Sequence, residues 1–532
     1  MADWLALLAA VGASLPVERA AAAETTDPVL GLLLQKGVIT EDEAAKAEAQ
    51  IADERTNEAA PALNSNWKTT AGMKNLQLYG DLRLRFEERQ EKDPSGGNIE
   101  LQRYRYAARL GLKGDPTDDT YFGFRLETSS NPRSSMVTLG TSSSSNPYVG
   151  PYGKSQNGIN VGQIYLGWQP ETWVDLTAGK MPNPLFTSAM VWSPSINPEG
   201  LAEQFKATVG QVDFFATLGQ FLYQDANPVA ATPDLGLGFN NGATGQNANN
   251  IFQLAWEGGL TYHITPTTSF KVAATFYQYE GEQQGNSTSE ISPFFGDTYV
   301  GEGAYTGPGS AYYTQANGYS GYTTSGLPSQ VNPQAGAYSL NYPNNQTGIN
   351  NLEVVEVPFE LKFKVSQLDA LLFGDVAYNL QGSQRAEAAA TAYQEYLTSQ
   401  SATTKGFAPQ TGDDKAYQIG VALASEGGLG LINGATAKKH AWELRTYWQH
   451  IEQYSLDPNL LDLDFNAGAE NLQGIYAAAA YGFTDNFIGT FRYGHASRIN
   501  NRLGTGGTGT DIPQINPITQ YDIFQVDLTL KF

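Results

Sequence analysis

The sequence predicts an all-β protein, a transmembrane antiparallel β-barrel of about sixteen strands that follows a short N-terminal helical segment. Three observations predict this fold. Apolar and polar residues alternate through most of the 532-residue chain, and the connections between alternating segments are short and long in turn. In addition, the last alternating segment ends on Phe532, the final residue of the sequence.

Alternation is clearest at residues 75–113. Apolar residues occupy the even positions from 76 to 86, and charged residues such as Arg83 and Arg85 lie between them. After a turn around Pro94, the even positions from 104 to 112 are again apolar and alternate with charged residues such as Arg103 and Arg105. Successive side chains of a strand point to opposite faces, so one face is apolar and the other ionic. This pattern suits lipid outside and water inside.

The same rule applied along the chain gives sixteen strands, an even number, as closed bacterial barrels require. They are predicted at 75–88, 101–113, 120–128, 159–168, 173–181, 202–209, 212–222, 251–263, 269–280, 352–364, 368–381, 416–424, 440–451, 473–483, 487–497 and 520–532.

The lengths of the connections support a barrel. Short periplasmic turns and long external loops alternate in outer-membrane barrels, whereas a soluble sandwich or propeller has no reason to alternate in this way. Short connections are predicted at 114–119, 169–172, 264–268 and 484–486, and long ones at 129–158, 182–201, 281–351 and 498–519.

The last strand is predicted to close the barrel. Its apolar positions form one uninterrupted stripe, and the ending resembles the C-terminal assembly signal that the barrel assembly machinery reads in outer-membrane proteins. The stripe consists of Phe524, Val526, Leu528, Leu530 and Phe532.

The N-terminal region divides into three parts before the barrel at 75–532. Residues 1–23 resemble a signal peptide, with a short apolar stretch before Ala20–Ala23, although no basic residue precedes that stretch. A buried N-terminal helix is the alternative. Residues 24–56 form a predicted periplasmic helical segment in which Leu30, Leu33 and Leu34 share one face, and residues 57–74 form a polar linker.

Composition excludes several functions. The formal net charge of −22 argues against nucleic-acid binding, which depends on neutralising phosphates. Without any Cys the chain can hold neither thiolate metal sites nor a c-type haem, and its four His have no metal-ligand spacing. We therefore expect no metal, no cofactor and no enzymatic activity, although a Ser–His pair is not excluded by sequence alone.

Several segments resemble the putative porin family of Gram-negative outer membranes. These are residues 179–186 (GKMPNPLF), 192–194 (WSP), 197–200 (NPEG) and the helical element at 34–44 (LQKGVITEDEA). The resemblance implies a barrel with passive pore activity in the cell outer membrane, in contact with its lipid, and it names no solute. The function we expect is passive diffusion of small hydrophilic solutes or ions. A structural or adhesive barrel with a loop-filled lumen is the alternative. A homotrimer is a further expectation, based on barrel size and the N-terminal helices.

Charged side chains on the inner face are the candidate pore lining. The first three strands supply arginines and later strands supply carboxylates, so that basic and acidic walls would face each other across the lumen and favour polar solutes. The alternative is a solvated ionic network in which Glu87 and Glu127 neutralise the arginines. The candidates are Arg83, Arg85, Arg103, Arg105, Arg109, Arg125, Glu257, Glu356, Glu360, Asp375 and Glu443.

The third external loop, residues 182–201, is the candidate constriction. General porins fold their third loop into the barrel, and several prolines would stiffen such a fold here. Prolines are equally ordinary in loops that stay outside. The candidate residues are Pro182, Asn183, Pro184, Trp192 and Glu199.

Overall fold

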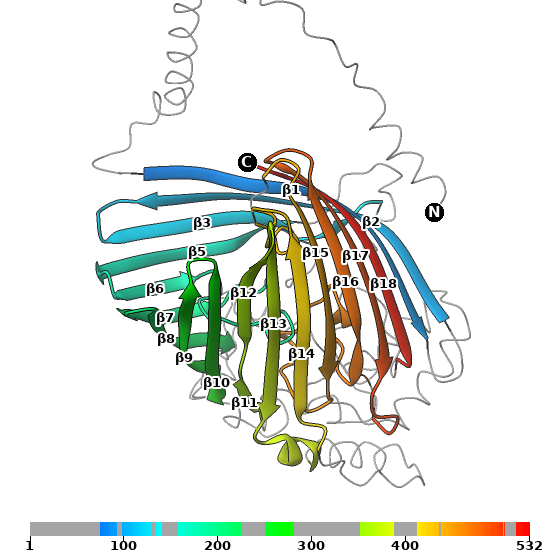
Figure 1. Ribbon diagram of the computed structural model, residues 1–532. Helices are drawn as coiled ribbons and strands as arrows, with labels where there is room; N and C mark the ends of the chain where they lie inside the picture. The colour runs from blue at the N-terminus through cyan, green and yellow to red at the C-terminus, as the bar shows by residue number, and fades with distance from the viewer. Residues whose placement is uncertain are drawn as a thin grey trace, which may run out of the picture. The chain divides into compact units, whose positions relative to one another are not determined.

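Alternating sequence produces long antiparallel strands throughout the described part of the chain (Figure 1). The structure is a computed structural model that describes residues 75–92, 98–129, 134–140, 158–224, 251–280, 352–387, 412–435, 438–503, 505 and 518–532. The predicted signal peptide, helical segment and linker at residues 1–74 lie outside these ranges.

The strands are β1 (Asn75–Lys92), β2 (Asn98–Asp115), β3 (Thr120–Ser129), β4 (Val137–Thr138), β5 (Gly158–Glu171), β6 (Val174–Lys180), β7 (Glu199–Val209), β8 (Val212–Gln224), β9 (Ile251–Thr265), β10 (Thr268–Glu280), β11 (Glu353–Glu356), β12 (Phe359–Val365), β13 (Leu368–Asn379), β14 (Lys415–Ala424), β15 (Trp442–Ile451), β16 (Leu472–Gly482), β17 (Phe487–Arg498) and β18 (Gln520–Lys531). Residues 382–387 are helical, and Asn466–Gly468 form a short 3₁₀ helix. None of the described helices has the length and apolar character needed to cross a bilayer.

These eighteen labelled strands form a closed barrel of sixteen wall strands. β4 is a two-residue strand that pairs with β2 beyond the end of β3. β11 and β12 each pair with β10 and with β13, so they are one wall strand interrupted at Val357 and Pro358. Pro358 cannot donate a ladder hydrogen bond, which explains the break. All sixteen predicted strands are therefore present, with ends that differ by a few residues.

The barrel closes between its first and last strands. β1 pairs with β18 along twelve residues of each strand, from Asp81 with Lys531 to Lys92 with Gln520. Beyond this register, the Gly80 and Phe532 backbones exchange two hydrogen bonds of 2.9 and 3.1 Å. A side chain at Gly80 would collide with the Phe532 ring, so glycine leaves room for the closing aromatic residue. Closure removes the free sheet edges, which would otherwise be unsatisfied in lipid.

The two faces of the wall have opposite character. In β1 the outward Leu82 and Leu84 are at least half exposed, whereas the inward Arg85 and Glu87 are buried. The same alternation in β18 turns Phe524, Val526, Leu528 and Leu530 outward. The outer wall is therefore an apolar surface suited to lipid, and the buried apolar core lies inside the ring, where loops meet the wall.

The connections at one end of the barrel are mostly tight. β7 and β8 are joined by Gly210 and Gln211 alone, and Gly210 adopts a positive φ of 63° that favours glycine. The β14–β15 connection (residues 425–441) departs from this pattern, because it is long and bends inward. Its Ile432 backbone N–H donates to the Glu443 carboxylate at 3.0 Å, and its Leu431 packs among inward aromatic residues.

Candidate functional site

The arginines of the first three strands lie on the inner face of the barrel. Arg85, Arg103 and Arg105 occupy buried odd positions of β1 and β2, and Arg83 and Arg109 follow the same alternation. Arg125 of β3 points the same way, because it bonds to Glu127 and lies near Arg109 and Asp81. We call these six residues, Arg83, Arg85, Arg103, Arg105, Arg109 and Arg125, the arginine wall.

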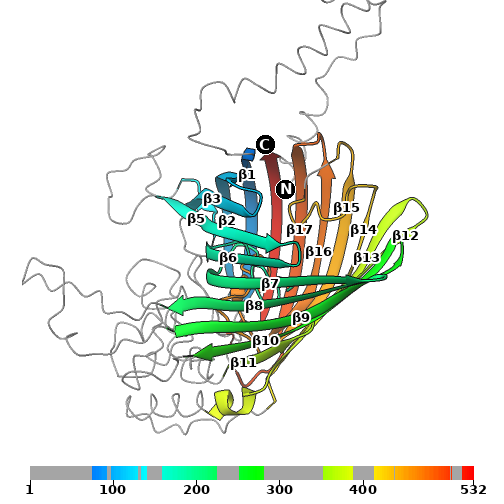
Figure 2. The same ribbon diagram turned by 90° about the vertical axis from the view of Figure 1, so that its left-hand side faces the viewer.

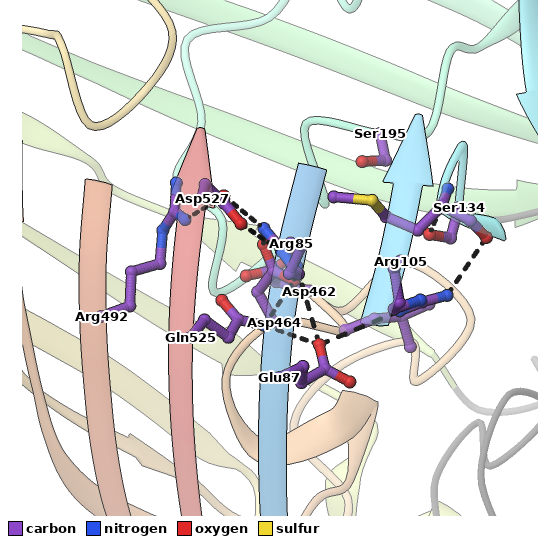
Figure 3. Close-up of polar contacts among 12 residues, drawn as sticks. Arg85, Glu87, Arg105, Ser134, Ser195, Asp462, Asp464, Arg492, Gln525 and Asp527 are labelled. Carbon is purple, nitrogen blue, oxygen red and sulfur yellow. Dashed lines mark hydrogen bonds and ion pairs between the residues drawn. The ribbon is translucent and has the colours of Figure 1, made fainter. Parts of the chain in front are cut away.

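The Glu87 carboxylate lies among four arginines, three of which belong to this wall. This buried carboxylate lies 2.5 Å from the Arg103 guanidinium and 3.0 Å from that of Arg89, and Arg85 and Arg105 approach within 3.7 and 3.9 Å. Figure 3 shows the Glu87 side chain on β1, with Arg85, Arg105 and Gln525 around it. A carboxylate with this many cationic neighbours is stabilised in its charged form even when buried. An ionic network around Glu87 is therefore present, but its single negative charge offsets only one of these four cations.

Arg85 joins the wall to a distant loop. Its guanidinium donates to Asp527 of β18 at 2.7 and 2.9 Å, and to Asp464 at 2.5 Å (Figure 3). Asp527 also accepts a hydrogen bond from Arg492 of β17. Arg85 and Asp464 are 379 residues apart in sequence, and this ion pair ties the β15–β16 connection to the first strand of the barrel.

The other three arginines of the wall, Arg83, Arg109 and Arg125, make no ion pair with Glu87 in the described part of the chain. Arg83 makes no hydrogen bond or ion pair within the residues that the structure describes, and its buried Nε has no partner there. Arg109 pairs with Asp81 at 2.6 Å and retains about a quarter of its side-chain exposure, 27%. Arg125 bonds to Glu127 at 3.2 Å. Arg83 is thus the wall residue whose charge is least compensated by a direct contact.

The third loop (residues 181–198) lies inside the barrel and is anchored to the far wall. The Phe186 N–H donates to Glu257 of β9 at 2.6 Å, the Thr187 hydroxyl to Glu356 of β11 at 2.7 Å, and the Ser188 hydroxyl to Asp375 of β13 at 2.5 Å. Buried carboxyl groups with such donors hold a loop firmly, because breaking these hydrogen bonds would leave buried polar atoms without partners. The loop crosses the lumen as a result.

The return segment of this loop reaches the opposite wall. Asn197 donates to the Gly162 carbonyl and accepts from Gln163 of β5, both at 2.9 Å. Between these anchors, the buried Trp192 packs edge-on against Phe221 and lies 6.5 Å from Tyr277. Of the other candidate constriction residues, Asn183 accepts the Leu185 N–H, Pro184 accepts from Gln204, and Glu199 pairs with Lys180 at the start of β7. Pro182 is exposed beside Asn183.

The predicted acidic residues lie inside the ring, but most of them do not face the arginines across open space. Glu257, Glu356 and Asp375 are buried under the third loop, and Glu443 is buried under the β14–β15 connection. Glu360 stays partly exposed and pairs with Lys362 at 3.2 Å. These carboxylates anchor inward segments, a role that the alternation of the strands did not indicate.

A second inward loop supplies the acids that do approach the arginine wall. In the β15–β16 loop (residues 452–471), Asp457 accepts from Tyr279 of β10 at 2.7 Å, and Leu463 accepts from Arg89 of β1 at 2.9 Å. It meets the third loop where the Ser193 N–H donates to Leu460 at 2.7 Å. Sequence reasoning missed this loop, although its Leu456, Leu460, Leu461 and Phe465 are an unusual number of apolar residues for an external connection.

Asp462 and Asp464 of the β15–β16 loop have different charge states. Burial and the nearby Asp464 carboxylate raise the pKa of Asp462 to about 7. Burial also opposes the ionisation of Asp464, but the guanidinium groups of Arg85 and Arg492 outweigh it and hold the pKa of Asp464 well below its usual range. Asp464 is therefore a permanent anion, whereas Asp462 titrates near neutral pH.

Polar groups from three segments keep exposed surface on the inner side of the ring. The Arg109 side chain of the wall is 27% exposed, the Asp464 side chain of the β15–β16 loop is 35% exposed, and Ser195 of the third loop is exposed. Figure 3 shows Asp462 and Asp464 next to Arg85 on β1, with Arg105 and Ser195 nearby. Within the described residues no cluster of three or more His, Asp or Glu is arranged to hold a metal ion.

A closed barrel with an apolar outer wall, a charged inner face and a third loop folded inside is the architecture of a porin-type channel embedded in a membrane. The sequence family described as "Putative porin" matches residues 95–532. The chain belongs to this family, which confirms the resemblance found in the sequence.

Solved structures with a similar fold share little sequence with this chain. One is Salmonella typhi OmpF in complex with daunomycin (9% identity, TM-score 0.40, covering 86% of this chain and 97% of that one). Another is an anion-selective porin from Comamonas acidovorans (10% identity, TM-score 0.39, covering 86% of this chain and 99% of that one). A third is the outer membrane channel DcaP of Acinetobacter baumannii (8% identity, TM-score 0.38, covering 88% of this chain and 99% of that one). No curated protein matches the sequence.

Proposed function

We propose that this chain is an outer-membrane porin that allows passive diffusion of small hydrophilic solutes or ions. The observation that carries the proposal is the exposed polar surface inside the ring, which we take to line a passage between the arginine wall and the two inward loops. Arg109, Asp464 and Ser195 keep exposed polar surface there, inside a ring whose other inward side chains are largely buried. Charged, water-accessible groups in the interior of a barrel are typical of a conducting lumen.

Planar-bilayer recording on the purified, folded barrel tests this function. Stepwise, ohmic conductance in a simple salt is the expected result, since the proposed passage needs no energy source and no moving carrier. Heat-modifiable mobility in gel electrophoresis shows that the sample is folded. Folded protein that produces no conductance steps would overturn the proposal.

A structural or adhesive barrel with a loop-filled lumen is the second candidate. The contacts among inward segments favour it: the third loop meets the β15–β16 loop at Ser193 and Leu460, and the β14–β15 connection contacts Arg492 through the Ile432 carbonyl. The same bilayer experiment separates the two candidates, because a filled lumen conducts little.

We further propose export by the predicted signal peptide, and insertion through the barrel assembly machinery by means of the last strand. The outward stripe that ends at Phe532 supports the second step, because its apolar side chains are free to be recognised.

We also propose a homotrimer. The outer wall of β5 exposes Ile159, Ile164, Leu166 and Trp168, an apolar surface available to another copy as well as to lipid. Mass measurement in mild detergent decides this point, and the mass of a single barrel would count against it.

A further inference from the structure

A cavity of about 500 Å³ lies inside the barrel between the third loop and the wall formed by β7, β8, β9 and β10. Figure 2 shows these four strands side by side. The third loop covers the cavity with Leu185 and Phe186, and the inward residues Lys206, Phe215, Glu257 and Lys271 line the wall. A volume of this size accommodates a small organic molecule.

The Lys271 ammonium is held over aromatic rings without a hydrogen-bond acceptor. Its Nζ lies 3.8 Å from the Phe186 ring centroid and 4.8 Å from that of Phe215. The two rings meet edge to face, 6.5 Å apart at 85°. Aromatic faces attract a cation but accept none of the strong hydrogen bonds that its three N–H groups can donate. In the described ranges, Lys271 forms no hydrogen bond or ion pair.

The carboxylates around the cavity already have donors. Glu257 accepts the Phe186 N–H at 2.6 Å, and Glu360 pairs with Lys362 at 3.2 Å. Asp213 accepts from the Thr208 hydroxyl and contacts the His263 ring, both at 2.7 Å. Lys206, the second ammonium on the lining, has no ion pair with any residue the structure describes. The cavity therefore presents unused donors next to apolar rings.

We propose that this cavity is a binding subsite for small organic carboxylates that carry a planar apolar body. The carboxylate accepts hydrogen bonds from Lys271, with Lys206 as a second cation, and the planar body packs against Phe186 and Phe215. Both halves of the ligand are needed: the ammonium selects the anion, and the rings favour an apolar group over a fully hydrated ion. The subsite refines the proposed porin function by naming a solute class.

Equilibrium binding tests the subsite without relying on conduction. The probe is 4-fluorobenzoate, followed by ¹⁹F NMR line broadening with the folded barrel in detergent, and 4-fluorobenzamide is its uncharged counterpart. We expect saturable benzoate binding that Lys271→Gln weakens tenfold or more and that Lys271→Arg largely retains. Benzamide should bind about tenfold more weakly than benzoate, because it lacks the charge.

Lys113→Gln is the matched control. Lys113 also holds its ammonium over an aromatic ring, 4.9 Å from the Tyr79 centroid, but on β2, away from this cavity. Benzoate affinity should not change in this variant. Equal affinities of wild type and Lys271→Gln, or equal binding of benzoate and benzamide, would overturn the subsite.

Bilayer recording on the same samples separates this inference from the porin function. Conductance without benzoate binding removes the subsite alone, and binding without conductance removes the porin function alone. If Lys271 served only to position the third loop, Lys271→Gln would alter conductance and leave benzoate affinity intact. Phe215→Leu provides an independent variant, in which loss of the ring lowers benzoate affinity several-fold and acetate binding stays unchanged.

Discussion

Arg83 and Arg103 face the same lumen from neighbouring strands, yet their charges are compensated differently. Arg103 lies 2.5 Å from the buried Glu87, whereas Arg83 has no direct partner among the described residues. A charge with an adjacent counter-ion contributes little to the field beyond the pair, and an uncompensated one contributes fully. At the scale of single residues, selectivity should therefore depend on Arg83 far more than on Arg103.

Replacement of these two arginines separates selectivity from stability. Arg83→Ser should shift the zero-current potential in a salt gradient towards cation preference, with a permeability ratio altered about twofold, or ~0.4 kcal/mol. Arg103→Ser should shift it less but lower thermal stability, since hydrogen bonds to charged groups contribute about 1.5–3 kcal/mol. Both shifts should grow at low salt, where screening is weaker. Identical reversal potentials for Arg83→Ser and wild type at low salt would show that Arg83 does not face the permeation path.

Asp462 makes the passage sensitive to pH. Because its pKa is about 7, acidification from pH 8 to pH 6 converts it from anion to neutral acid, while Asp464 stays charged. The interior of the ring loses one negative charge near Arg85 and Arg492, so anion preference should increase as the pH falls. Reversal potentials measured across this range check the prediction. Asp462→Asn should show the acidic-pH selectivity at every pH; a pH response as large as that of wild type would assign it to another group.

At the scale of elements, buried carboxylates explain how the third loop stays inside the ring. Glu356 accepts hydrogen bonds from Tyr277 of β10 and from Thr187 of the loop, at 2.6 and 2.7 Å, and Ser188 bonds to Asp375 beside it. The loop is thus attached to two wall strands at adjacent points. Three acidic residues predicted to contact solute, Glu257, Glu356 and Asp375, instead attach the third loop to β9, β11 and β13.

Weakening this attachment should widen the passage. Glu356→Gln replaces one of the two oxygens that accept from Thr187 and Tyr277 by an amide NH2 group, at a cost of about 1–3 kcal/mol in loop anchoring. We expect a larger unit conductance and more current fluctuation in single-channel recordings. Glu443→Gln is the control, because it also converts a buried wall carboxyl group to an amide, but Glu443 contacts the β14–β15 connection. Equal effects of the two variants would mean that general destabilisation, and not loop release, changes the current.

At the scale of the whole molecule, the sequence predicts the strands of the wall but not the loops folded inside it. Strand number and the inward direction of Arg83 or Arg105 follow from a two-residue period, which is local and readable from the sequence. The inward loops depend on contacts such as Ser188 with Asp375, 187 residues away, and Arg85 with Asp464, 379 residues away. Alternation carries no information about such pairs. The likeness to general porins suggested the third loop, and only the apolar residues of the β15–β16 loop marked the second.

Closure of the barrel brings the two ends of the sheet together, and the last residue takes part directly. Phe532 exchanges two backbone hydrogen bonds with Gly80 and turns its ring outward, about half exposed, over the space that the glycine leaves free. Its removal should leave the first strand without its final partner and shorten the apolar stripe of β18.

Deletion of Phe532 should therefore lower the yield of assembled barrel several-fold in cells, measured as heat-modifiable protein in the membrane fraction. Purified chain refolded in detergent should lose much less, because two hydrogen bonds at about 0.5–1.5 kcal/mol each are a small part of the pairing between β1 and β18. Phe483→Ala is the control, since Phe483 is a similarly exposed outward ring at the same end, near Tyr481 and Phe487. Equal losses in cells and in detergent would assign Phe532 a role in stability alone, whereas a loss confined to cells identifies the terminal stripe as the signal read during assembly.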